Sequence, residues 1–186
     1  MRPTGGLAAA WWAGCCDKVN DSPGREGTVD LFSYEFQTLD AQPLPLAGFR
    51  GKAVLLVNTA SQCGYTPQYA GLQSLWQRFR ERGLLVLGVP SNDFGGQEPG
   101  SGQQIADFSA ARYRVDFPLT EKVSVIGPHA HPLYRQIAQE LGEGGSPRWN
   151  FHKFLFDRDG ELAGAWPARV APDDPPLLAA IEAALG

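Results

Sequence analysis

A strand, a helix and a second strand follow one another between residues 52 and 91, and this order restricts the fold more than any other feature. The segments KAVLLVNTA (52–60) and LLVLGVPS (84–91) are short, continuous apolar runs, typical of strands buried on both faces of a sheet. The segment between them (66–83) has apolar residues at helical spacing. Because the chain crosses over the sheet between the two strands, they should be parallel. The sequence therefore predicts an α/β fold.

The predicted helix at 66–83 carries signals at both ends. Thr66 is an expected N-cap, and Pro67 suits the first helical position because proline has no N–H to leave unpaired there. Gly83 is expected to end the helix. Its buried face should consist of Leu72, Leu75, Trp76 and Phe79.

The other segments complete a mixed sheet flanked by helices. Residues 28–40 alternate with period two, like a short antiparallel strand pair, and a turn-like stretch follows at 40–51. A loop rich in glycine and proline is expected at 91–101. The remaining predictions are a helix at 102–115 capped by Ser101, a weaker strand at 119–127, a helix at 131–142, a hairpin at 150–168 with Asp159-Gly160 in its turn, and a closing helix at 175–186.

Charge and cysteine content exclude several classes of protein. The net charge of −4 argues against a general nucleic-acid binder and against a protein that binds anionic membranes. The three cysteines, Cys15, Cys16 and Cys63, are an odd number and two of them are adjacent, so this is not a disulfide-stapled secreted scaffold. The sequence contains no run of eighteen or more apolar residues, so no membrane span is predicted.

The first 27 residues are interpreted as an extension ahead of one domain at 28–186. MRPTGGLAAAWWAGCC weakly resembles a bacterial lipoprotein signal with Cys15 as the lipidated residue, although its apolar run is short. The alternatives are a disordered tail or a start codon assigned too early. We expect a cytoplasmic protein, with export or lipid anchoring through Cys15 as the alternative.

Cys63 is the candidate reactive residue. It follows the first buried strand and precedes a helix, a position that lies in the ligand-binding crevice of open α/β sheets. Unpaired N–H groups and the partial positive charge of a helix start favour a thiolate, the reactive form of cysteine. The alternative is a small buried packing residue. The polar neighbours Ser61, Gln62 and Gly64 argue against that alternative.

Three long blocks resemble the signature sequences of the glutathione peroxidase family, in the expected order. They are VNTASQCGYTPQYAGLQ, LGVPSNDFGGQEPGS and WNFHKFLFDRDG, and the resemblance extends from about Val29 to the C-terminus. It implies a thioredoxin-like fold and the reduction of hydrogen peroxide or organic hydroperoxides in oxidative stress defence, without a bound cofactor or metal. The implied catalytic residues are Cys63 as the peroxidatic cysteine, with Gln97, Trp149 and Asn150 as its partners.

The chemistry explains these residue types. A thiolate attacks the outer peroxide oxygen and becomes a sulfenic acid. The leaving oxygen develops negative charge and needs donors nearby, which the amides of Gln97 and Asn150 and the indole N–H of Trp149 would supply. Because all three are neutral, they would stabilise the sulfur anion without an inert ion pair.

The sequence departs from the family pattern at the resolving cysteines. Many relatives that use thioredoxin carry a resolving cysteine in the helix after the GGQEP loop, where this chain has Ser109. A further cysteine that is common in the family is replaced by Ser91, so only Cys15 or Cys16 remains as an internal partner. We therefore predict a one-cysteine cycle in which external thiols, glutathione or alternatively thioredoxin, regenerate the enzyme. The short segment before Trp149 resembles that of relatives that are monomers or weak dimers.

Other functions are weaker interpretations. His129 and His131 suggest a metal site, but no nearby acid or cysteine completes it. A copper metallochaperone would need a Cys-x-x-x-Cys pair, and Pro67 occupies the second position. A peroxide sensor that passes its oxidation from Cys63 to a partner protein remains an alternative.

Overall fold

The computed structural model describes residues 28–142 and 145–186, and its centre is strand β3 (Ala53–Thr59). Every residue of β3 and of β4 (Leu84–Pro90) is buried, as expected for strands covered on both faces. The two strands are parallel and pair without a break from Ala53 opposite Leu84 to Thr59 opposite Pro90. This confirms the predicted strand–helix–strand unit.

The sheet is mixed, as predicted, with the strand order β4-β3-β5-β6. Strand β5 (Lys153–Phe156) runs antiparallel to β3, and β6 (Leu162–Trp166) forms the predicted hairpin with β5. Gly160 in the hairpin turn has φ +85°, a conformation that favours glycine, and a Cβ there would lie 2.7 Å from the Phe32 ring. The turn therefore requires glycine for both its backbone and its packing.

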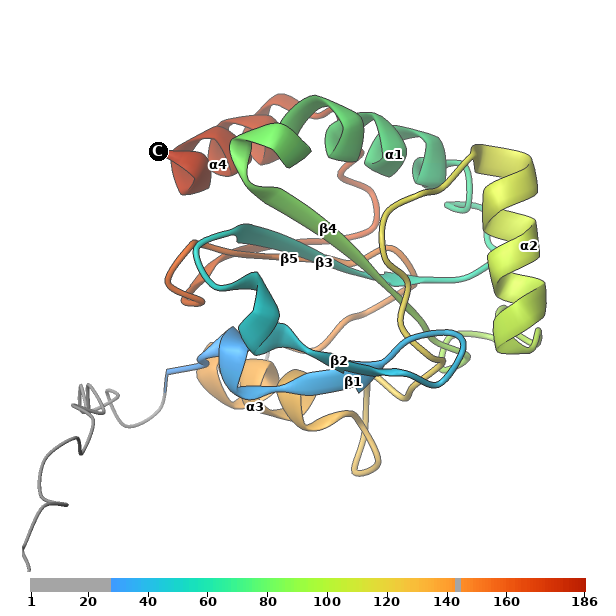
Figure 1. Ribbon diagram of the computed structural model, residues 1–186. Helices are drawn as coiled ribbons and strands as arrows, with labels where there is room; N and C mark the ends of the chain where they lie inside the picture. Colours follow the sequence, from blue (N-terminus) through green and yellow to red (C-terminus); the bar gives the residue numbers. More distant parts are fainter. Residues whose placement is uncertain (1–27, 143–144) are drawn as a thin grey trace, which may run out of the picture.

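Helices cover both faces of the sheet (Figure 1). Helices α1 (Gln68–Phe79) and α4 (Pro175–Leu185) pack on one face, where Leu55 of β3 joins their apolar residues. Helix α3 (Pro132–Leu141) packs on the other face, where Leu56 points. This alternation follows from the period of two along a strand, and it divides the core into two layers.

Helix α2 (Gly102–Tyr113) starts as the sequence predicts. The Ser101 hydroxyl accepts a hydrogen bond from the Gln104 N–H, and the Gln104 side chain accepts one from the Ser101 N–H. This reciprocal capping satisfies backbone donors that the first turn leaves unpaired. In Figure 1 the helix stands beyond one end of the sheet.

The N-terminal region differs from its prediction. Residues Leu31–Ser33 and Leu46–Phe49 are short 3₁₀ helices, η1 and η2. The strand pair exists, but it joins β1 (Glu35–Gln37) to β2 (Pro43–Pro45), which lies in the stretch predicted as a turn. The prolines at both ends of β2 argued against a strand, because proline cannot donate a backbone hydrogen bond and is confined largely to edge strands. Both strands of this two-stranded sheet are edge strands, so the prolines are tolerated.

The predicted strand at 119–127 is wrong. Only Leu119 and Thr120 make isolated bridges, to Gly88 and Thr38. Further along, the N–H groups of Val125 and Ile126 donate to the Asp93 carboxylate instead of to a neighbouring strand. A side chain thus takes the donors that a strand ladder would have used.

The predicted N-cap of α1 is also wrong, whereas Gly83 ends the helical segment as predicted, after the 3₁₀ turn η3 (Arg80–Arg82). The helix begins at Gln68 with Pro67 as its N-cap, and Thr66 lies outside it. The predicted apolar face is otherwise observed, with Leu72, Leu75 and Phe79 buried and Trp76 partly buried. No helix within 28–142 or 145–186 has the length and apolar character needed to cross a bilayer.

Candidate active site

Three loops meet at one edge of the sheet. Because β3 and β4 are parallel, the loops that follow them, 60–67 and 91–101, leave from the same edge. Strand β5 is antiparallel to β3, so the loop that precedes it arrives at this edge too, where Lys153 pairs with Val57. The topology therefore brings the blocks that contain Cys63, Gln97 and Asn150 to one place.

Cys63 lies in a hydrogen-bonded turn before α1. Its N–H donates to the Thr66 Oγ1 at 2.9 Å, and the Thr66 hydroxyl donates to the Ala60 carbonyl at 2.9 Å. Thr66 therefore holds both ends of the cysteine loop instead of capping the helix. The Tyr65 N–H donates to the Cys63 Sγ at 3.4 Å, so a backbone dipole points at the sulfur.

The Cys63 thiol is free and partly exposed. It lines an open hollow of about 480 Å³, to which α2 contributes Phe108, Arg112 and Tyr113. A sulfur in this position is accessible to a small molecule from solvent.

Gln97 and Asn150 contact each other directly. The Asn150 Nδ2 donates to the Gln97 Oε1 at 2.9 Å, although the two residues are 53 positions apart in sequence. Asn150 is fully buried and Gln97 is partly exposed. The Gln62 N–H donates to the Gln97 carbonyl at 3.0 Å, which ties the cysteine loop to the Gln97 loop.

Trp149 lies beside this pair with 40% of its surface exposed. Its ring centroid is 5.8 Å from that of Phe94. Its carbonyl accepts a hydrogen bond from the Asn58 Nδ2 at 3.0 Å, and the Asn58 carbonyl accepts one from the Phe151 N–H at 2.6 Å. Asn58, at the end of β3, thus fixes the backbone on both sides of Asn150.

Phe151 has φ +66°, which is uncommon for a residue with a side chain and costs on the order of 1–2 kcal/mol. Its ring is fully buried and meets the Tyr69 ring edge-on at 5.4 Å. This packing, together with the bond to Asn58, holds the unusual conformation. The resulting turn carries Trp149 and Asn150 at the sheet edge.

Of the four predicted site residues, only Gln97 and Asn150 are joined by a hydrogen bond between their side chains. Gln97 and Asn150 are hydrogen-bonded, and Cys63 is joined to them through the backbone of its neighbour Gln62. Within the described part of the chain, no hydrogen bond links the Cys63 sulfur to the side chain of Gln97, Trp149 or Asn150.

Glu98 is a buried carboxyl that the sequence analysis missed. Its side chain is fully buried, and its Oε1 accepts from the Ser61 hydroxyl at 2.6 Å. Burial raises the pKa of Glu98, which the Ser61 hydrogen bond and the Lys122 charge partly offset. The Glu98 N–H is held by the Asn92 Oδ1 at 2.9 Å. Its only sequence signal was its place beside Gln97.

Lys153 and His152 are two further buried groups near the edge. The Lys153 Nζ donates to the Gln68 Oε1 at 2.7 Å and to the Phe151 carbonyl at 2.8 Å. Burial lowers the pKa of Lys153 to about 8, opposed by the charge of Asp174. Burial also lowers the pKa of His152 to about 4, helped by the cations Lys153 and Arg148. Neither ring nitrogen of His152 has a hydrogen-bond partner among the described residues.

The positions of the missing resolving cysteines are both buried. Ser91 donates its N–H to the Thr59 carbonyl, and the Ser109 hydroxyl donates to the Ala106 carbonyl on α2. Cys15 and Cys16, and the predicted extension at 1–27, lie outside the described residues.

The two histidines that suggested a metal site lie in separate environments. His129 is exposed, whereas the His131 ring stacks on Phe36 and its Nε2 lies 2.9 Å from the Glu35 carbonyl. In the described part of the chain, no three His, Cys, Asp or Glu side chains form a group that could hold a metal ion.

Comparison with known proteins gives a consistent result. The family described as glutathione peroxidase matches residues 31–138. Hydroperoxy fatty acid reductase gpx1 of Synechocystis sp. is 46% identical over 152 residues, which cover 77% of this chain and 90% of that protein. Glutathione peroxidase-like peroxiredoxin gpx1 of Schizosaccharomyces pombe is 46% identical over 125 residues, covering 66% of this chain and 79% of that protein.

Solved structures agree with the fold. The crystal structure of Trgpx in apo form superposes with a TM-score of 0.68 at 32% identity, covering 84% of this chain and 96% of that one. A thioredoxin-family thiol:disulfide interchange protein from Chlorobium tepidum superposes with a TM-score of 0.61 at 18% identity, covering 82% and 93%. Together with the mixed sheet and its flanking helices, these similarities confirm the predicted thioredoxin-like α/β fold.

Proposed function

This chain belongs to the glutathione peroxidase family and is a peroxidase, and on this premise we propose that it reduces hydrogen peroxide and organic hydroperoxides through Cys63. The observation that carries the proposal is the hydrogen bond from Asn150 to Gln97, with the bond from the Gln62 N–H to the same glutamine. These two bonds support the proposal, because they join Gln97 and Asn150 to the loop that carries the partly exposed thiol.

The first half-reaction begins with the Cys63 thiolate attacking the outer oxygen of the peroxide. A sulfur–oxygen bond forms and the oxygen–oxygen bond breaks, so the sulfur is oxidised to a sulfenic acid and the peroxide is reduced. The leaving alkoxide or hydroxide takes up a proton and departs as alcohol or water. The Tyr65 N–H at 3.4 Å from the sulfur stabilises the thiolate that starts the step.

Gln97, Asn150 and Trp149 are proposed to stabilise the negative charge of this step. Because the Gln97 oxygen already accepts from Asn150, its Nε2 remains the available donor of that amide. Asn150 is therefore a positioning residue, since it orients Gln97 from a fully buried site. Trp149 precedes Asn150 in the chain and is partly exposed, so its indole N–H is a further proposed donor.

The second half-reaction is proposed to use two external thiols. The first thiol attacks the sulfenic sulfur, and a mixed disulfide forms as water leaves. The second thiol attacks the mixed disulfide, which releases an oxidised disulfide and restores the Cys63 thiolate. Serines at the buried positions 91 and 109 favour this one-cysteine cycle over an internal disulfide. Glutathione is the proposed reductant, and thioredoxin is the alternative.

Fatty acid hydroperoxides are proposed as substrates alongside small peroxides. The similarity to a protein named hydroperoxy fatty acid reductase supports this substrate class, and so does the open hollow at Cys63. Reduction of such lipids would serve oxidative stress defence. We propose that the protein is a monomer or weak dimer in the cytoplasm. Reduced thiols are plentiful in that compartment.

The test is NADPH-coupled peroxide turnover, run once with glutathione and its reductase and once with thioredoxin and its reductase. Steady turnover with either thiol supports the proposal, and faster turnover with glutathione supports the reductant. A single turnover with both would contradict it and would favour a peroxide sensor that transfers its oxidation to a protein.

A further inference from the structure

The two residues that precede the reactive cysteine have open space on two sides. Ser61 and Gln62 both line the Cys63 hollow, and both also line a second cavity of about 430 Å³. Gln62 is exposed and Ser61 is half-buried. Packing therefore covers little of this segment, and its position depends on hydrogen bonds.

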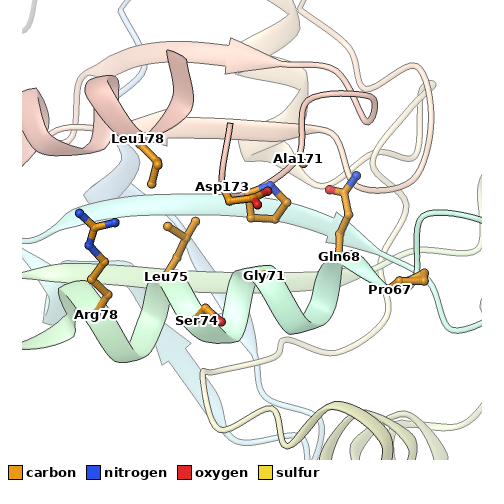
Figure 2. Close-up of a pocket in the computed structure, with 10 residues that line it drawn as sticks. Pro67, Gln68, Gly71, Ser74, Leu75, Arg78, Ala171, Asp173 and Leu178 are labelled. Carbon is orange, nitrogen blue, oxygen red and sulfur yellow. The ribbon is translucent and has the colours of Figure 1, made fainter. Parts of the chain in front are cut away.

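The chain that follows Cys63 is held more firmly. Figure 2 shows Gln68 and Gly71 on the first turns of α1. Gly71 lies against Pro172, where an added Cβ would come within 3.0 Å of that side chain, and the Gln68 Nε2 donates to the Ala168 carbonyl at 2.6 Å. The start of α1 is thus fixed to the segment before α4. The less constrained side of the cysteine is the one that contains residues 61 and 62.

Two hydrogen bonds join this segment to consecutive residues of the Gln97 loop. The Ser61 hydroxyl donates to the Glu98 Oε1 at 2.6 Å, and the Gln62 N–H donates to the Gln97 carbonyl at 3.0 Å. Because neighbouring residues make the two bonds, loss of the first frees the backbone that makes the second. The Ser61–Glu98 bond therefore supports the contact between the Cys63 loop and the Gln97 loop.

Glu98 is itself held firmly in place. Its side chain is fully buried, its N–H donates to the Asn92 Oδ1 at 2.9 Å, and its carbonyl accepts from the Lys122 Nζ at 3.0 Å. The Glu98 Oε2 has no hydrogen-bond partner among the described residues. Burying a carboxyl that is only partly satisfied costs free energy. A group of this kind beside a reactive thiol is typical of a functional site.

We propose that Glu98 is a positioning residue for the peroxidase reaction, which acts through Ser61 to hold Cys63 in a fixed place relative to Gln97. The inference rests on the proposed peroxidase function and adds a residue to it. A misplacement of about 1 Å between reacting groups can cost about 10²-fold in rate. A bond that sets the spacing of the nucleophile and its donor should therefore have a large effect on the peroxide step.

The first test breaks the bond from each of its ends in the full chain. Ser61→Ala and Glu98→Ala should each lower the second-order rate constant with hydrogen peroxide about tenfold or more. Glu98→Gln keeps an oxygen that accepts from Ser61, so it should restore the rate constant to within about threefold of the natural value. Glu161→Ala, at an exposed position in the hairpin, is the matched control.

Ser61→Ala decides this test if Glu98→Ala does not fold, because it removes only a hydroxyl from a half-buried position. A rate constant in Ser61→Ala within about twofold of the natural chain would overturn the proposal.

A double-mutant cycle separates positioning from a general loss of stability. If the bond acts by holding Cys63 near Gln97, Ser61→Ala should cost less than about twofold when Gln97→Ala is already present. An equal loss in both backgrounds would overturn the proposal, since a general loosening of the site does not depend on Gln97.

Amide hydrogen exchange tests the contact without any peroxide. In Ser61→Ala the Gln62 N–H should exchange about tenfold faster or more. The Ser91 N–H, which donates to the Thr59 carbonyl at the same edge of the sheet, should keep its natural rate. Unchanged exchange at Gln62, or equal acceleration at Ser91, would overturn the role of Glu98. Failure of the natural chain to reduce any peroxide, with Gln62 responding as expected, would count against the peroxidase proposal and not against this contact.

Discussion

The side-chain amide of Asn150 donates to the side-chain oxygen of Gln97 at 2.9 Å, from a position that solvent does not reach. Each of these residues comes from a different loop, and the sheet topology makes the loops adjacent. The bond leaves the Gln97 Nε2 as the free donor of that amide among the described residues, directed by a buried partner. A preorganised donor of this kind needs no reorganisation when charge develops on a substrate.

Replacing Gln97 should slow the peroxide step without removing it. Loss of one preorganised donor typically costs about 10²-fold or more in rate. We expect Gln97→Ala to lower the second-order rate constant with hydrogen peroxide by about that factor, measured by stopped-flow tryptophan fluorescence. Gln103→Ala, at an exposed position on α2, is the control. An unchanged rate constant in Gln97→Ala would remove this residue from the site.

Asn150 should act through Gln97. Because its role is to orient the amide, Asn150→Ala combined with Gln97→Ala should be little slower than Gln97→Ala alone. The double-mutant cycle on the peroxide rate constant measures this coupling. Additive losses would indicate that Asn150 contacts the reacting atoms independently.

Cys63→Ser should abolish peroxide reduction, because the Cys63 thiol, which lines the open hollow, is the proposed nucleophile. Cys15→Ser and Cys16→Ser should leave the rate nearly intact, and they serve as matched controls in the coupled assay. Near-normal turnover by Cys63→Ser would contradict the whole mechanism.

The oxidised enzyme should lack an internal disulfide. After one equivalent of peroxide without thiol, we expect the Cys63 peptide to gain one oxygen, and a second as peroxide is raised. With glutathione present it should carry the glutathione adduct instead. Intact-mass and peptide-mass spectrometry distinguish these products. A loss of two hydrogens that links Cys63 to Cys15 or Cys16 would overturn the one-cysteine cycle and favour thioredoxin as reductant.

His152 should make the fold sensitive to acid. Its pKa is lowered to about 4 in the folded state from an ordinary value of 6.5, so the unfolded chain takes up the proton first as pH falls. The free energy of unfolding should therefore decrease between about pH 6.5 and 4, by on the order of 3 kcal/mol from this group.

The measurement is urea unfolding at several pH values in this window. His152→Asn should show a shallower decrease than the natural chain, whatever its stability at pH 7, whereas the exposed His129→Asn should show the same decrease. Identical pH dependence in His152→Asn would mean that the ring is hydrated or paired in solution.

The strand–helix–strand unit, the mixed sheet and the late hairpin could all be predicted from the amino-acid sequence. The hydrophobic pattern of each element follows from how many of its faces are buried. Strands β3 and β4 are continuous apolar runs because both faces of each strand are buried, whereas α1 has a single apolar face because only one side of the helix is buried. The family blocks likewise identified Cys63, Gln97, Trp149 and Asn150 as candidates, because those motifs are long and specific.

The contacts between these segments depend on the three-dimensional fold and could not be predicted from the sequence. The Asp93 carboxylate takes the backbone donors of the segment predicted as a strand, and Thr66 holds the cysteine loop instead of capping α1. The bond between Gln97 and Asn150 and the burial of Glu98 depend on loops that are distant in sequence. The periodicity of apolar residues indicates which positions of a helix or strand are buried, but a hydrogen bond between two loops produces no periodic pattern in the sequence. These contacts form only because the sheet places the loops side by side.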